Sequence, residues 1–267
     1  MILRLLNQFE TLAADETATQ RPTSRREAFS GIGRAFGKAA VIGLPLAALF
    51  KPNSLAAQTG GGNDAISVLN FALTLEYLEA SFYEQGLSAN GLLTGDTRAT
   101  IALIGAHEDQ HVDFLRTAIS GAGGTPVESP EFDFTAGGAF ADVFSNEATF
   151  LAVAQALEDT GVRAYKGQAG NLLGTGDILT AALQIHSVEA RHASMIRRMR
   201  GSKGWITGDT NTTAAAAAPV YAGEGNLTQL GLNAATVGGV STEEATEAYD
   251  EPLSRQAVLD IAGLFIA

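Results

Sequence analysis

Apolar residues recur with helical spacing in several stretches between residues 64 and 200. This spacing predicts four amphipathic helices, the third of them weakened in its first turns. We place them at about residues 64–86, 97–119, 139–170 and 177–200. Asp64 is expected to cap the first helix, and Ser254 is expected to cap a short fifth helix near the C-terminus. The pattern favours an all-α fold.

The connection between the second and third predicted helices is unusually long. Residues 121–138 (GAGGTPVESPEFDFTAGG) are rich in Gly and Pro. Adjacent antiparallel helices need only short loops, so this length predicts a crossover to the far end of a four-helix bundle made of two hairpins. After residue 200 the composition shifts to Gly, Thr, Ala and Asn, which predicts an extended tail that wraps the bundle. The apolar face of the fifth helix should dock on its own bundle or on a second subunit.

The N-terminal segment resembles an export signal, and we separate it (1–57) from the bundle (58–200) and the tail (201–267). Arg25 and Arg26 precede an apolar run of twelve residues and a small-residue site. This order is similar to a twin-arginine signal, although Ala28 stands where such signals usually have an aromatic residue. The run is short of the roughly 20 residues that span a bilayer. We therefore expect a periplasmic or otherwise exported protein rather than an anchored one, with membrane contact only if this segment is retained.

The composition limits the available site chemistry. The chain has 267 residues, of which 46% are hydrophobic, so a sizeable core can form. It contains no cysteine, so any metal must be held by oxygen and imidazole nitrogen. The formal net charge is −12 and no basic stripe is present, so a nucleic-acid partner is not expected.

Two Glu-x-x-His pairs stand out in the second and fourth predicted helices. Glu108 precedes His111, and Glu189 precedes His192, by three residues. Residues three apart share one face of a helix, so each pair offers a carboxylate and an imidazole together. All four histidines of the chain lie in these two stretches. A repeated pair favours metal binding over a solvated helix face.

A glutamate precedes each pair at a similar distance. Glu76 lies 32 residues before Glu108, and Glu158 lies 31 residues before Glu189. Each has a tyrosine seven residues later, Tyr83 and Tyr165, two turns along the same face. This repetition indicates an internal duplication of one helical hairpin. Glu79, one turn from Glu76, is either a ligand or a carboxylate behind the ligands, and the matched spacing favours Glu76 as the ligand.

Together the two halves supply four carboxylates and two imidazoles, enough to hold two metal ions. Buried carboxylates repel one another unless cations offset their charge. Oxygen-rich ligation with imidazole suits iron or manganese, and both can leave positions open for dioxygen or peroxide. Tyr83 and Tyr165 could each hydrogen-bond a ligand of the opposite hairpin, or serve only as core side chains. His107 and His186 lie off the ligand face and are expected at the surface or behind the ligands.

The order of these residues resembles the ferritin-like superfamily of di-metal carboxylate bundles. The stretch LNFALTLEYLEASFYEQG and the closing YDEPLSRQAVLDIAGLF are more similar to an exported branch related to plant desiccation-associated proteins. The resemblance covers residues 64–200 well and the tail more loosely. It implies that Glu108 and Glu189 bridge the metals, that His111 and His192 each bind one, and that Glu76 and Glu158 are terminal ligands.

Two functions are compatible with this pattern. One is an oxidoreductase with a di-iron or di-manganese centre that reacts with dioxygen or peroxide. The other is a non-catalytic structural, stress-protection or accessory subunit that keeps an idle site. The lack of cysteine argues against a rubredoxin-like electron relay. The choice between iron and manganese stays open, as does a partner in the form of a second copy or a component of an envelope complex.

Overall fold

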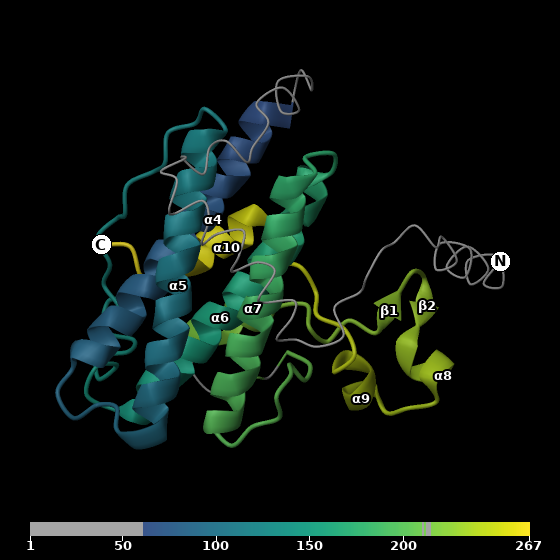
Figure 1. Cartoon of the computed structure of the whole chain (residues 1–267). Helices are drawn as coiled ribbons and strands as arrows, with labels where there is room; N and C mark the ends of the chain where they lie inside the picture. The colour runs from purple at the N-terminus through teal and green to yellow at the C-terminus, as the bar shows by residue number, and fades with distance from the viewer. Residues whose placement is uncertain (1–60, 210, 212–214) are drawn as a thin grey trace, which may run out of the picture. The chain divides into compact units, whose positions relative to one another are not determined.

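The computed structural model describes residues 61–209, 211 and 215–267 (Figure 1). The predicted export signal in residues 1–57 lies outside the described residues. None of the helices in the described part combines the length and the apolar character needed to cross a membrane.

Four long helices form the body of the described chain. They are α4 (Gly61–Ser88), α5 (Gly95–Gly121), α6 (Glu147–Ala169) and α7 (Asp177–Met199). Consecutive helices pack as two hairpins, α4 with α5 and α6 with α7, and the hairpins meet chiefly through α4 and α6 (Figure 1). Most side chains of α6 are therefore buried. The predicted all-α four-helix bundle is confirmed.

The predicted start of the third helix is wrong by about two turns. Residues 139–145 form turns, and α6 begins only at Glu147, where the side chain of Asn146 accepts the backbone N–H of Ala148. Phe140 and Val143 have helical spacing, but they belong to these turns, and their buried side chains pack into the hydrophobic core. The first helix also begins earlier than predicted, so that Asp64 lies within α4 and not at its cap.

The connection from α5 to α6 runs the length of the bundle. Near the end of α5, Ala118 lines the same pocket as Gln168 near the end of α6. The start of α6 lies at the opposite end, where the Phe150 ring stacks on Phe82 of α4 at 4.6 Å between ring centroids. Figure 1 shows the connection passing along one side of the helices. The predicted crossover is confirmed.

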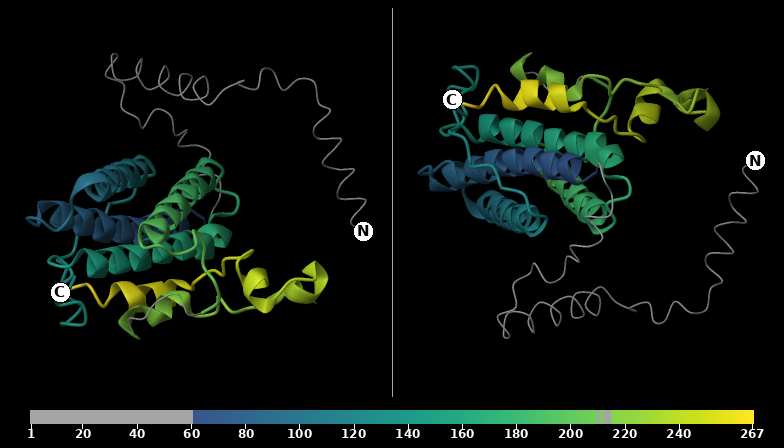
Figure 2. Two further views of the ribbon diagram at one scale, coloured as in Figure 1. Left: turned by 90° about the horizontal axis from the view of Figure 1, so that it is seen from below. Right: turned by 90° about the horizontal axis from the view of Figure 1, so that it is seen from above.

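The tail contains more regular structure than the extended segment that the sequence predicts. Its elements are η3 (Ala215–Tyr221), β1 (Thr228–Gln229), β2 (Leu232–Asn233), α8 (Ala234–Gly238), α9 (Thr242–Thr246) and α10 (Arg255–Ala262). The two short strands pair antiparallel. The predicted fifth helix is α10, which buries Val258 and Ile261 against its own bundle, next to α6 and η3 (Figure 2).

A buried arginine in α6 ties the tail to the bundle. Arg163 is 0% exposed, and its guanidinium donates to three backbone carbonyls of the tail. Nε reaches the carbonyl of Glu251 at 2.7 Å, Nη2 reaches that of Ala222 at 2.7 Å, and Nη1 donates to that of Val220. The Glu224 carboxylate lies 2.8 Å from Nε and offsets the buried charge. These three hydrogen bonds and the ion pair, which we call the Arg163 clamp, hold η3 and the segment before α10 on α6.

Candidate metal centre

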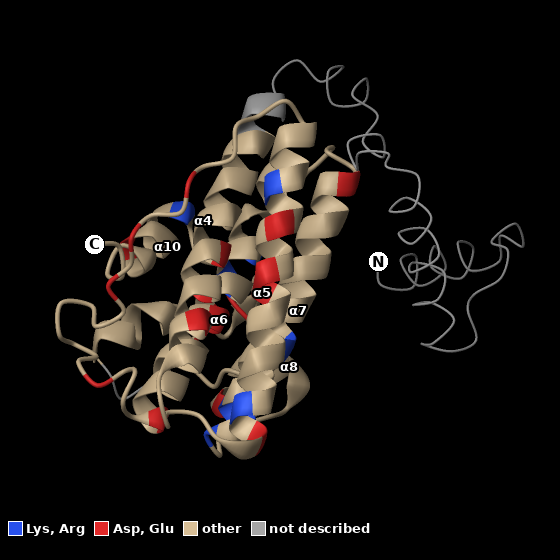
Figure 3. Ribbon diagram, turned by 60° about the vertical axis from the view of Figure 1, so that its left-hand side comes forward, with Lys and Arg blue, Asp and Glu red and all other residues tan. Residues whose placement is uncertain are grey.

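The six predicted ligands converge midway along the bundle, where acidic positions gather in Figure 3. The four glutamates are fully buried, His192 is 5% exposed, and His111 is half-buried. Their ligand atoms form two groups, each within 4.8 Å of one another. The groups are Glu76, Glu108, His111 and Glu189, and Glu108, Glu158, Glu189 and His192. Glu108 and Glu189 belong to both groups, as side chains that bridge two ions must.

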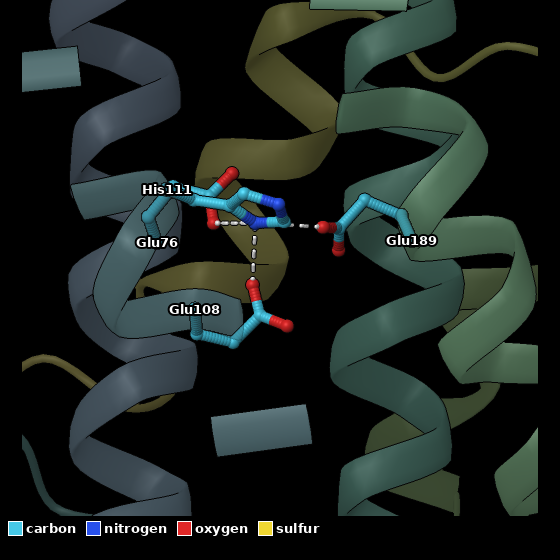
Figure 4. A group of neighbouring side chains, drawn as sticks. All are labelled: Glu76, Glu108, His111 and Glu189. Atoms are coloured by element: carbon cyan, nitrogen blue, oxygen red, sulfur yellow. Dashed lines mark hydrogen bonds and ion pairs between the residues drawn. The ribbon is translucent and has the colours of Figure 1, made fainter. Parts of the chain in front are cut away.

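The first group surrounds the ring of His111 (Figure 4). Its Nδ1 lies 2.8 Å from Glu108 Oε2 and 3.1 Å from Glu76 Oε2. Glu189 reaches the same nitrogen from the other hairpin, with Oε1 at 3.3 Å (Figure 4). One nitrogen therefore faces three carboxylate oxygens. A single cation placed among them could be bound by all four side chains.

The second group is built in the same way around His192. Its Nδ1 lies 2.8 Å from Glu108 Oε1 and 3.3 Å from Glu158 Oε2. The two oxygens of Glu108 thus point into different groups, one toward each histidine. Each hairpin thus supplies one Glu-x-x-His pair and one further glutamate to the two groups.

Several buried side-chain atoms of the two groups lack a hydrogen bond of good geometry, and their nearest partners are one another at ion-pair distance. Within the described residues, these unpaired atoms include Glu108 Oε1, Glu158 Oε2, both Oε atoms of Glu189, and His192 Nδ1. An unpaired buried polar atom typically costs about 1–3 kcal/mol. Their residues all belong to the two groups of ligand atoms, where bound cations would satisfy the unpaired atoms. The donor set of carboxylate oxygen and imidazole nitrogen therefore fits metal ions.

The electrostatics of the centre also favour cations. Burial raises the pKa values of Glu189 and Glu79 well above the usual value for a glutamate, and neighbouring carboxylates raise both further. Burial likewise raises the pKa of Glu108 to about 7, although His111 and His192 act in the opposite direction. Without a cation the folded protein therefore disfavours the ionised form of these groups, which is the form that binds metal.

Two tyrosine hydroxyls each hydrogen-bond a buried glutamate across the interface between the hairpins. The hydroxyl of Tyr83 in α4 donates to Glu158 Oε1 in α6. The hydroxyl of Tyr165 in α6 donates to Glu76 Oε1 in α4 at 2.5 Å. Burial raises the pKa of both tyrosines, so each hydroxyl keeps its proton and remains a donor. Of the two roles that the sequence allowed, the structure shows the cross-hairpin hydrogen bond.

Glu79 is buried beside the centre but belongs to neither group of ligand atoms. A side chain at Gly161 of α6 would collide with this region. A Cβ there would lie 2.8 Å from Glu189 Oε2 and 3.1 Å from Glu79 Oε1. The absence of a side chain at Gly161 therefore lets two carboxylates approach the α6 backbone. The sequence signal for this role is the position of Gly161 three residues after Glu158, on the ligand face.

The two remaining histidines have different surroundings. His107 Nδ1 lies 2.9 Å from His192 Nε2, and the two rings stack at 5.2 Å between centroids. His107 thus lies behind a ligand, where it can orient the ring of His192. His186 belongs to neither ligand group.

Comparison with known proteins agrees with this geometry. A family model described as the ferritin-like domain matches residues 64–202, which is more than half of the chain. No curated protein is similar enough to count as a match. The matched residues include all four long helices from Asp64 onward and every residue of the candidate centre. The chain belongs to the ferritin-like domain family.

Proposed function

We propose that this protein holds two iron or manganese ions between its hairpins and uses them in redox chemistry with dioxygen or peroxide. The observation that carries the proposal is the set of buried, unpaired ligand atoms that converge in two groups. Two groups that share Glu108 and Glu189 suit a pair of bridged ions better than one ion. The predicted export signal supports a location outside the cytoplasm.

Each residue of the centre has a role in this proposal. Glu108 and Glu189 would bridge the ions. One ion would also be held by Glu76 and His111, and the other by Glu158 and His192. Four carboxylates would offset the charge of two divalent ions. Iron or manganese bound there would supply a redox-active pair with positions open to an oxidant.

The surrounding side chains keep the ligands in place and limit access of water. The Tyr83 and Tyr165 hydroxyls fix the two terminal glutamates from opposite hairpins. His107 contacts the ligand ring of His192 from its outer side. Because the glutamate ligands are fully buried, water has little access to them, and the oxidant must enter through the bundle.

An oxidant-consumption assay tests this function. We expect the full chain, loaded anaerobically with Fe(II) or Mn(II), to consume dioxygen or hydrogen peroxide faster than the same concentration of free metal. Glu108→Ala removes the bridge and should lower this rate at least roughly tenfold. Glu84→Gln is the control, because Glu84 is an exposed glutamate of α4.

A loaded protein that consumes neither oxidant faster than free metal would contradict the redox proposal. It would favour the alternative of a structural, stress-protection or accessory subunit. A Glu108→Ala variant with the unaltered rate would instead contradict the assignment of the site.

A further inference from the structure

An apolar pocket lies inside the bundle beside the candidate centre. All four long helices line it, and its wall is hydrocarbon except for Tyr165 and Gln168. Phe114 of α5 and Ala181 of α7 are its partly exposed lining residues, so it can open to solvent between these two helices. The assigned ligands and tyrosine hydrogen bonds do not require this space.

The pocket adjoins the ligands along the bundle. Ala72, in its wall, lies one helical turn before Glu76, and Leu115 lies one turn after His111. The faces that carry the ligands therefore continue directly into the pocket. Tyr165 contacts both the pocket and the candidate centre, because its ring lines the pocket while its hydroxyl donates to Glu76.

The opposite side of the centre is packed differently. There the ring of Tyr83, the counterpart of Tyr165 in the duplicated hairpin, meets Phe82 edge-on at 5.6 Å between centroids. Phe82 in turn stacks on Phe150. The pocket at the Tyr165 side has five alanines in its wall, Ala72, Ala118, Ala164, Ala181 and Ala182, beside larger apolar side chains such as Phe71 and Phe114. The short side chains of the alanines leave the space that the larger side chains of the wall do not fill.

The size and the lining of the pocket restrict its occupant. The centre of a water-sized sphere can move through about 20 Å³ of it. One water needs about 10–15 Å³ by this measure, so there is room for one or two very small molecules. Apolar walls give water or peroxide too few hydrogen-bond partners to bind well. An uncharged, apolar diatomic gas matches both limits.

We propose that this pocket is the entry and holding site for dioxygen on its way to the metal centre. The inference rests on the proposed function and narrows the oxidant from dioxygen or peroxide to dioxygen. The gas would enter between α5 and α7 and pass the small alanine side chains. It would reach the ligands beside Tyr165.

Xenon binding tests the pocket without relying on activity. Xenon is an apolar gas that occupies dry cavities, and it can be located in crystals of the full chain under xenon pressure. We expect one xenon site between Ala118 and Ala182 in the unaltered protein. Ala118→Leu should fill the space and abolish xenon binding. Ala102→Leu, the same change at an exposed position of α5, should leave xenon binding unaltered.

The smaller change Ala182→Val serves if Ala118→Leu prevents folding, as judged by circular dichroism. In the metal-loaded protein, the filled variant should consume dioxygen severalfold more slowly and peroxide at the unaltered rate. Equal slowing with both oxidants, or no xenon in the pocket, would overturn this inference.

The outcomes separate the two proposals. Metals bound and an oxidant consumed, but no xenon, would leave the proposed function standing and remove the gas pocket. Xenon bound in a protein that holds no metal would support an apolar gas cavity. It would contradict the proposed function and, with it, the inferred dioxygen route.

Discussion

Replacing Glu189 with Gln is expected to change the stability of the protein in opposite directions with and without metal. In the metal-free protein Glu189 is fully buried, and burial and neighbouring carboxylates raise its pKa, so the folded protein favours its neutral form. The amide removes the cost of keeping this carboxyl protonated, so it should raise the free energy of unfolding at neutral pH by about 1–3 kcal/mol. In the metal-loaded protein the same change removes a bridging ligand. It should then forfeit most of the about 4 kcal/mol that a metal at a thousand times its Kd contributes.

The stability that Glu189→Gln adds to the metal-free protein should also depend on pH. Burial raises the pKa of Glu189 above 4.5, so its contribution to stability falls as pH rises above that value. The Glu189→Gln gain should therefore be largest at neutral pH and shrink near pH 4.5. Urea unfolding, carried out once with chelator and once with added metal, measures the change in the free energy of unfolding in each state. Glu84→Gln removes the same charge from an exposed site and should show neither effect. Destabilisation of the metal-free protein would contradict the prediction.

Arg163→Met is expected to cause the largest loss of stability outside the centre. The substitution keeps an apolar chain of similar length but leaves three tail carbonyls without their donor. It also leaves the buried Glu224 carboxylate without its cation. Breaking a buried ion pair on one side typically costs about 3–5 kcal/mol. Chemical denaturation of the full chain measures this loss.

A protease assay separates release of the tail from general weakening. We expect thermolysin, which cuts before apolar residues, to cut Arg163→Met first within residues 215–254, because the hydrogen bonds that hold this segment on α6 are gone. Arg98→Met is the matched control, since Arg98 is exposed and donates to the Leu87 carbonyl at 2.8 Å. Its cost should stay within about 0.5 kcal/mol. Equal costs for the two variants would contradict the role of Arg163.

The helices and the candidate centre were predictable because their signals are local. A three-residue spacing places Glu108 beside His111 on any helix, whatever the rest of the chain does. The repetition of that spacing at Glu189 and His192 made it informative, and the long Gly- and Pro-rich connection predicted the crossover. The structure brings all six of these predicted ligands together.

Other features depend on contacts between distant parts of the chain and could not be predicted in this way. Arg163 reaches carbonyls 57 to 88 residues away in sequence, and no local pattern marks such partners. Arg197 fits a favourable charge at a helix C-terminus, yet it is buried and pairs with Asp159 of α6 at 2.5 Å. Phe140 and Val143 have the spacing of a helix, but turns place them in the core.

The pocket beside Tyr165 is another feature of this kind. Alanine is a strong helix former, so alanines in these helices suggest nothing unusual in the sequence. Only the meeting of Ala72, Ala118 and Ala182 from three helices shows that they leave a space. The space that they leave therefore becomes visible only in three dimensions.

The most direct test of the central claim is the number of metal ions per chain. The full chain would be purified without chelator and its metals counted by mass spectrometry, with Glu108→Ala measured beside it. We predict two iron or manganese ions per chain in the unaltered protein and fewer in the variant. A folded protein that contains no metal, and still binds none after anaerobic reconstitution with Fe(II) or Mn(II), would contradict the claim that this cluster is a metal centre.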